Sequence, residues 1–220
     1  MDMEALFGGC SASQISDAMD RAVGTTALRP MHGSAKLIGR ARTVSTRSGD
    51  NLFIHAALRR LRPGDVLVVD GGGDPSRALV GEIMKRVAQS KGCVGFVIDG
   101  AIRDVESFVV DGFPCFARNV THRGPYKNGP GSIGGTVSID GMVVADGDVI
   151  VADSDGVVAV PAHRVASVAA AAGEIAVREA AVLASILENR YDDRWLDEIA
   201  VNQGFDFALP VNRPQGTDAG

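Results

Sequence analysis

The chain has 220 residues, of which 45% are hydrophobic and 22% are charged, and its formal net charge is −5 at pH 7. This composition is typical of a globular protein, and the acidic balance argues against a nucleic-acid partner, which usually requires a basic surface. No stretch is apolar over the ~20 residues of a membrane span, and the acidic segment MDMEALFGG lacks the basic region of a signal peptide. We therefore expect a cytoplasmic protein with neither a membrane partner nor a nucleic-acid partner.

The chain is predicted to begin with alternating helices and strands. Ser11 and Gln14 have the spacing of a helix capping box, and apolar residues recur after them at helical intervals. A Pro-Gly-Asp turn signal then precedes an unbroken apolar run, which is typical of a strand buried on both faces. The elements expected in this part are a helix over Ser11–Ala22, a strand over Lys36–Thr46, a helix over Asn51–Leu61, a strand over Val66–Asp70 and a helix over Val80–Lys91.

A second buried strand, Cys93–Asp99, completes a strand–helix–strand unit with parallel strands. We expect Gly100 to end this strand and to turn the chain into Ala101–Asp104. Further on, short apolar segments separated by Gly-Asp turns predict an antiparallel β layer, and Pro161 suits the start of a long helix. The elements expected here are strands over Phe113–Ala117, Thr136–Ile139, Met142–Ala145, Val149–Ala152 and Val157–Val160, and a helix over Ala162–Arg190.

Together these elements predict an α/β fold with a mixed sheet and flanking helices in a single domain. We expect the domain to cover residues 1–190 and residues 191–220 to form a C-terminal extension. The extension carries apolar side chains that would have to pack on another surface. They are Trp195, Leu196, Ile199, Phe205 and Phe207.

Candidate site residues follow the two buried strands. In an open α/β sheet, ligands bind beyond the carboxyl ends of parallel strands, and these ends meet at one edge. After the first strand, Gly81 and Glu82 are expected to begin a helix. Backbone N–H groups without a partner at such a start, for example those of Ile83 and Met84, suit a carboxylate or a phosphate.

After the second strand come Arg103 and Asp104. An arginine can bind a carboxylate through two parallel hydrogen bonds, and an aspartate can bind a hard divalent cation through oxygen. An adjacent Arg-Asp pair is also common on solvated surfaces, so the pair alone leaves both interpretations open. Its position after a buried strand and a glycine favours a site.

Glu82 and Arg103 are separated by twenty residues, and Asp104 follows directly. This spacing resembles the acid–x20–Arg–Asp signature of the 4-hydroxy-4-methyl-2-oxoglutarate / 4-carboxy-4-hydroxy-2-oxoadipate aldolases, which belong with the RraA-like proteins. The segments GFVIDGAIRDVESF and ADGDVIVADSDGVVAVP agree with it, and the resemblance covers roughly Ser11–Ala172. The first acid is usually Asp in these aldolases, so the longer Glu82 is a departure.

The resemblance implies a class II aldolase with the RraA-like fold, of the swivelling β/β/α type, and with Mg²⁺ or Mn²⁺ as its cofactor. Asp104 would bind the metal directly and Glu82 through a water molecule. The reaction would cleave a 4-hydroxy-2-oxo acid to pyruvate and a carbonyl compound. Because loss of CO₂ from oxaloacetate gives the same enolate, oxaloacetate decarboxylation would be a side activity.

The resemblance also assigns the residues that handle the substrate. Arg103 would hold the small 2-oxo acid and act in catalysis together with Glu82. Gly81 and the amides of Ile83 and Met84 would bind the carboxylate of the substrate, and His55 would lie near the pocket as a further catalytic residue. The family implies a homotrimer, or a hexamer built as a dimer of trimers.

A lysine Schiff base would be a different mechanism for the same cleavage. Lys85 and Lys91 are expected on a helix among charged or polar neighbours, so neither resembles the desolvated lysine that such chemistry needs. The sequence therefore favours the metal-dependent mechanism.

Two other functions remain open. RraA-like regulators of ribonuclease activity act by contact without catalysis, and they have Gly at the first acid position and an acid three residues after the Asp. This chain has Glu82 and Ser107 at those positions, which favours the enzyme. The second alternative is another metal-dependent lyase or isomerase that acts on an enolisable acid at the same site.

Overall fold

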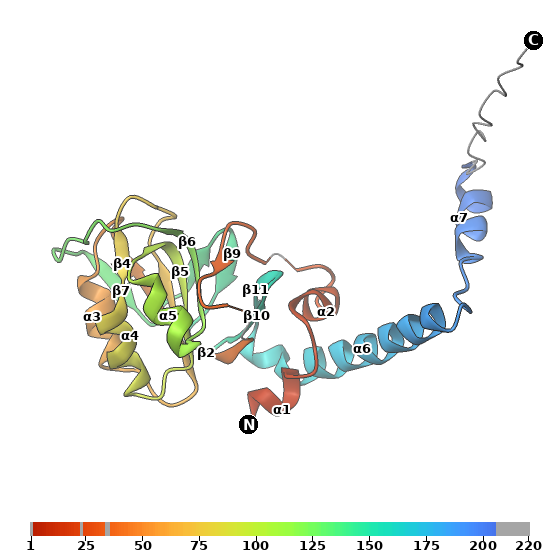
Figure 1. The fold of residues 1–220 in the computed structure, drawn as a ribbon, viewed down its shortest axis with the longest axis horizontal. Coiled ribbons are helices and arrows are strands. Elements are labelled where there is room, and N and C mark those ends of the chain that lie inside the picture. The colour runs from red at the N-terminus through yellow and green to blue at the C-terminus, as the bar shows by residue number, and fades with distance from the viewer. Residues whose placement is uncertain (1, 23, 34–35, 206–220) are drawn as a thin grey trace, which may run out of the picture. The chain divides into compact units, whose positions relative to one another are not determined.

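The computed structural model describes residues 2–22, 24–33 and 36–205. The chain divides into two units, Met1–Val177 and Arg178–Gly220. The first unit combines a mixed sheet with flanking helices, which confirms the expected α/β fold (Figure 1). Phe207, expected to pack in the C-terminal extension, lies outside the described residues. No helix in the described ranges is both long enough and apolar enough to cross a membrane.

The main sheet has the strand order β1-β6-β5-β3-β2-β10-β11, with β4 paired to β5 and β7 paired to β2. The central pairs β2–β3, β3–β5 and β5–β6 are parallel. The antiparallel pairs are β1 with β6, β7 with β2, β10 with β2, and β11 with β10. The strands are β1 (Arg29–Pro30), β2 (Leu37–Thr46), β3 (Asp65–Asp70), β4 (Ala78–Val80), β5 (Gly95–Ile102), β6 (Cys115–Val120), β7 (Gly131–Ile133), β10 (Val149–Asp153) and β11 (Gly156–Val160).

The two faces of the sheet are covered differently. One face packs against α3 (Leu52–Leu58), α4 (Glu82–Gln89) and α5 (Val105–Asp111), which gather on one side of the sheet in Figure 1. The other face packs against a separate hairpin, β8 (Val137–Ile139) and β9 (Met142–Val144). Burial of apolar side chains on both faces explains why the central strands carry unbroken apolar runs.

A third apolar cluster lies against β10 and β11. It is formed by α1 (Met3–Phe7), α2 (Ala12–Asp17) and the first turns of α6 (Val165–Leu187), which a 3₁₀ turn at Ala162–Arg164 precedes. In the second unit, α7 spans Trp195–Gln203. The expected capping box at Ser11 is present, but α2 ends five residues before Ala22, because Asp20 and Arg21 adopt positive φ angles.

The structure corrects the expected end of the second parallel strand. β5 does not stop at Asp99 but continues through Gly100 to Ile102, since β4 pairs alongside its last residues. A Cβ atom on Gly100 would lie 2.8 Å from Leu79 Cδ1. The glycine is therefore needed to leave room for the Leu79 side chain of β4, and it does not form a turn. Helix α4 begins at Glu82 and not at the expected Val80, because Val80 belongs to β4 and Gly81 is the N-cap residue.

The four downstream strands do not form one antiparallel layer. β8 and β9 form the separate hairpin, whereas β10 and β11 extend the main sheet from β2. Short strands with similar turns can pair in several ways, and long-range packing decides which pairing forms.

Candidate functional site

The two junctions that follow β4 and β5 lie together, as the parallel arrangement predicts. The backbone N–H of Arg103 donates to the carbonyl oxygen of Val80, with 3.1 Å between the atoms. This bond places the residue after β5 beside the residue after β4, which is Gly81. Gly81 and Arg103, which are 22 positions apart in the sequence, therefore meet at one edge of the sheet.

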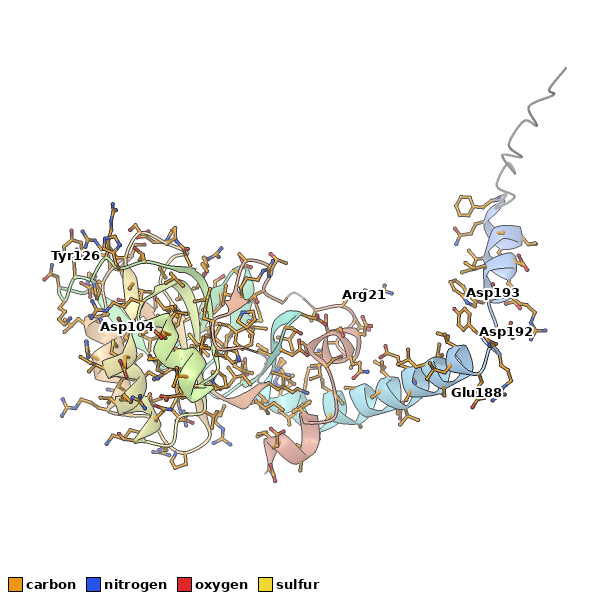
Figure 2. All side chains as sticks on the ribbon, viewed as in Figure 1. Arg21, Asp104, Tyr126, Glu188, Asp192 and Asp193 are labelled. Atoms are coloured by element: carbon orange, nitrogen blue, oxygen red, sulfur yellow. The ribbon has the colours of Figure 1, made fainter. Side chains whose placement is uncertain are left out.

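Asp104 occupies the N-cap position of α5, where Figure 2 labels it, and has a left-handed backbone conformation with φ of 55°. Its Oδ2 atom accepts a hydrogen bond of 3.0 Å from the backbone N–H of Glu82. The same oxygen lies 3.6 Å from Nε of Arg103. A Cβ atom on Gly81 would lie 2.5 Å from it, so only glycine leaves room for the carboxylate here.

A cavity of about 250 Å³ opens beside these residues. It brings together many of the residues singled out in the sequence, whereas Glu82 and Asp104 are not part of its lining. The lining residues are Asn51, His55, Ala78, Leu79, Val80, Gly81, Ile83, Met84, Arg103, Pro125 and Lys127.

The N-terminus of α4 offers hydrogen-bond donors to this cavity. Gly81, its N-cap residue, has no side chain to cap the helix. Within the described part of the chain, no hydrogen bond occupies the backbone N–H groups of Ile83 and Met84. These donors, with Arg103 in the same lining, form an arrangement suited to a carboxylate.

The cavity lining also contains residues that the sequence analysis did not single out. Lys127 and Pro125 come from the loop before β7, and Asn51 precedes α3. Nδ2 of Asn51 donates to the carbonyl oxygen of Leu79 at 3.0 Å, while its Oδ1 is buried without a hydrogen-bond partner. A single lysine in a Gly/Pro-rich loop has no sequence pattern that indicates a site, so only the fold could identify it.

Asp50 anchors the loop that carries Lys127. Its Oδ2 accepts backbone hydrogen bonds from Asn128 at 2.6 Å and from Gly129 at 3.0 Å. Burial tends to raise the pKa of Asp50, but these bonds and the one from Leu52 outweigh it, so the pKa lies below its usual range. The ionised carboxylate therefore holds in place the loop that brings Lys127 to the cavity.

His55 lies in the lining, as the resemblance implied. Burial, and secondarily the positive charge of Lys127, lower the pKa of His55 below its ordinary value of 6.5. The imidazole is therefore largely neutral at pH 7, where it can donate or accept a hydrogen bond.

Glu82, the other acid at this edge, has a side chain that is 46% exposed, close to the 44% of Asp104. Its Oε1 lies 3.2 Å from Nη2 of Arg86, one turn along α4. Within the described ranges, no three His, Cys, Asp or Glu side chains gather as a metal cluster. The two carboxylates at this edge, those of Asp104 and Glu82, would leave most positions around a cation to water.

The structure corrects the expectation for Lys85. Its side chain is fully buried, although it was expected among polar neighbours. Its Nζ donates to the backbone carbonyl of Ser107 and to Oδ2 of Asp111, each at 2.6 Å, and Lys85 is not part of the cavity lining. Lys85 is desolvated but ion-paired away from the cavity, so it still does not provide a Schiff-base amine there.

Comparison with known proteins adds to this geometry. A 4-hydroxy-4-methyl-2-oxoglutarate aldolase of Thermus thermophilus is 34% identical over 59% of this chain and 78% of its own length. A protein of Halalkalibacterium halodurans whose name assigns it to the same aldolases is 38% identical over 73% of this chain and 77% of its own.

Solved structures agree with these relatives. The structure of the RNA-processing inhibitor RraA from Thermus thermophilus superposes with a TM-score of 0.62 at 31% identity, covering 68% of this chain and 91% of that one. The profile of the RraA-like family, described as Aldolase/RraA, matches residues 12–159, which include every candidate site residue named above. The chain therefore belongs to the RraA-like family.

Proposed function

We propose that this protein is a divalent-metal-dependent aldolase that cleaves a 4-hydroxy-2-oxo acid to pyruvate and a carbonyl compound. The observation that carries the proposal is the cavity in which Arg103 and the open N-terminus of α4 meet, next to the carboxylate of Asp104. The aldolase names of the relatives support the same reaction class.

The donors from Arg103 and the start of α4 suit the pyruvate half of the substrate. The amides of Ile83 and Met84 would bind its carboxylate, and the guanidinium of Arg103 would lie beside the 2-oxo oxygen. When the carbon–carbon bond breaks, that oxygen becomes the enolate oxygen and gains negative charge. A fixed positive charge close to it lowers the barrier more than it stabilises the substrate.

The cavity can also take a second carboxylate. Lys127 and His55 belong to its lining, and both can donate hydrogen bonds. A cavity of about 250 Å³ lined by two cationic side chains, Arg103 and Lys127, favours a short dicarboxylic acid over a monocarboxylic one. We therefore propose a 4-hydroxy-2-oxo dicarboxylic acid as the substrate class.

The residues at the sheet edge fit a hydrated hard cation such as Mg²⁺ or Mn²⁺. Asp104 is half exposed, and within the described residues a backbone N–H group engages its Oδ2 and none engages its Oδ1, which remains available as a direct ligand. Glu82, from the first turn of α4, would hold the ion through a water molecule. When bound, the cation would supply a positive charge that stabilises the enolate.

The proton balance of the cleavage requires a base. The bond between C3 and C4 breaks, its electron pair passes into the enolate, and the proton of the C4 hydroxyl group must leave. Glu82 would accept this proton through an intervening water molecule. Its Oε1 lies 3.2 Å from Nη2 of Arg86, which places a positive charge beside the carboxylate.

Pyruvate release tests the proposal. The purified protein would be assayed with 4-hydroxy-4-methyl-2-oxoglutarate, with a 4-hydroxy-2-oxo monocarboxylic acid and with oxaloacetate, each with and without EDTA. We expect the dicarboxylic substrate to be cleaved fastest, oxaloacetate to be decarboxylated more slowly, and EDTA to abolish both activities until Mg²⁺ or Mn²⁺ is restored. Unchanged rates in EDTA would exclude the metal-dependent mechanism.

A second candidate is a non-catalytic regulator of ribonuclease activity. The likeness to the RNA-processing inhibitor RraA supports it, although this chain has Glu82 where the resemblance predicts Gly in such regulators. Inhibition of ribonuclease cleavage by the purified protein, with no pyruvate release from any substrate above, would favour the regulator.

A further inference from the structure

Lys85 forms an unusual link between two helices. The Lys85 side chain is fully buried. Its Nζ donates hydrogen bonds to the carbonyl oxygen of Ser107 and to the carboxylate of Asp111, both on α5. The ammonium also lies 5.2 Å from the centre of the Phe108 ring. Arg86 adds a second cation to the same carboxylate at 2.7 Å. We call the bonds from Lys85 to Ser107 and Asp111 the α4–α5 clamp.

The clamp joins the two helices whose N-termini form the site. Helix α4 begins at Glu82, and α5 begins directly after Asp104. Lys85 lies one turn into α4, and Ser107 lies one turn into α5, so the clamp fixes the separation of the two helix starts. The Lys85 hydrogen bond lowers the pKa of Asp111, which keeps the carboxylate charged.

The distance between the starts of α4 and α5 can change little without disturbing the contacts of Asp104. The carboxylate of Asp104 occupies the space where a side chain at position 81 would lie. From this space its Oδ2 accepts the hydrogen bond of the Glu82 amide. Asp104 also has a left-handed backbone conformation, which Asp adopts more readily than most residues other than glycine.

We propose that Lys85 is a positioning residue, which through the α4–α5 clamp holds Asp104 against the backbone amide of Glu82 in the geometry that the reaction requires. Burying an ammonium group is costly, and an apolar pair of similar volume often stabilises a fold at least as well. The directed bonds of the ammonium group, by contrast, fix one orientation of α5 on α4. The expected effect of the clamp on catalysis rests on the proposed function, whereas its effect on the position of Asp104 rests on geometry alone.

Lys85→Met tests the clamp, because methionine has a similar length and removes both bonds. We expect kcat for pyruvate release to fall about tenfold to a hundredfold, with KM within about threefold of its original value. Hydrogen–deuterium exchange provides a readout that needs no activity. The amide of Glu82 should exchange at least about tenfold faster, because its bond to Asp104 is weakened.

Gln89→Met is the matched control, since Gln89 is the last residue of the same helix and does not line the cavity, and it should leave both measurements unchanged. If Lys85→Met does not fold, Asp111→Asn carries the test with smaller changes in the same direction. A folded Lys85→Met variant with the original Glu82 exchange rate would overturn the proposal, whatever its kcat. Faster exchange in a protein whose unmodified form releases no pyruvate would support the clamp and reject the aldolase assignment.

Discussion

At the scale of single residues, Asp104 combines a functional position with an unusual backbone. Its side chain is 44% exposed, so little of the core depends on it. Its φ of 55° is readily adopted by Asp and Asn, whereas alanine there would cost roughly 1–2 kcal/mol. Replacement by alanine therefore mixes loss of the carboxylate with backbone strain, and Asn is the better test.

We predict that Asp104→Asn lowers kcat/KM for pyruvate release by about a hundredfold or more, because the amide cannot supply the negative charge that a cation requires. The Tm should change little, since Asn keeps both the backbone conformation and an oxygen acceptor for the Glu82 amide. Steady-state kinetics with thermal unfolding would measure both. Near-normal turnover would remove Asp104 from the site.

Arg103→Lys should also be severely impaired, because an ammonium group lacks the planar pair of donors that matches a carboxylate. Arg123→Lys is a matched control, because this arginine is exposed in the nearby loop and does not line the cavity. We expect a fall in kcat/KM of about a hundredfold for the first variant and none for the second. Equal rates for the two variants would exclude Arg103 from binding the enolate.

At the scale of elements, the close approach of α4 and the β5–α5 junction depends on Gly81. Its backbone is extended, with φ of −154° and ψ of −167°, so any residue could adopt the conformation. The constraint is steric, because a Cβ atom would meet Asp104 Oδ2 at 2.5 Å and Arg103 Cγ at 2.9 Å.

We predict that Gly81→Ala displaces the Asp104 carboxylate and lowers kcat about tenfold to a hundredfold, at a cost in stability of about 1–3 kcal/mol. Gly135→Ala is the control, since a Cβ atom there would meet no heavy atom within 4 Å. Pyruvate release and denaturant unfolding would be measured for both variants. If both retain full activity, the tight junction is not required for the reaction.

At the scale of the whole molecule, the second unit and the surface beside the site have complementary chemistry. Within the described part of Arg178–Gly220, large apolar side chains are exposed, and acidic residues lie between them. A second cavity of about 290 Å³ is lined by apolar side chains that include Ile83 and Val87. Arg59 and Lys91 add positive charge to this lining. We propose that the C-terminal segment of another copy of this chain covers this surface in a homotrimer or hexamer.

Deleting residues 191–220 should therefore reduce catalysis more than it reduces folding. We expect a lower kcat/KM, because charge stabilisation weakens when the cleft is open to water, with little change in the Tm of the first unit. Light scattering combined with kinetics would measure assembly and activity together. A truncated chain with full activity would contradict a shared site.

The sequence by itself determined the parallel strand–helix–strand unit and the positions of Glu82, Arg103 and Asp104 around it. This was possible because unbroken apolar runs mark doubly buried strands and because parallel strands end at one edge. The local signals for turns were weaker: Gly100 was expected to end a strand, yet it lies within β5. A glycine in the sequence does not distinguish a turn from a close packing contact.

Only the tertiary structure decided which distant residues complete the site. Asn51 and Lys127 reach the cavity from separate segments, and no periodicity connects them to Arg103. Lys85 is buried only because α5 brings Asp111 and the Ser107 carbonyl to it, a helix that the local sequence did not predict. Burial and ion pairing depend on neighbours that are remote in sequence, so the chain order alone cannot determine them.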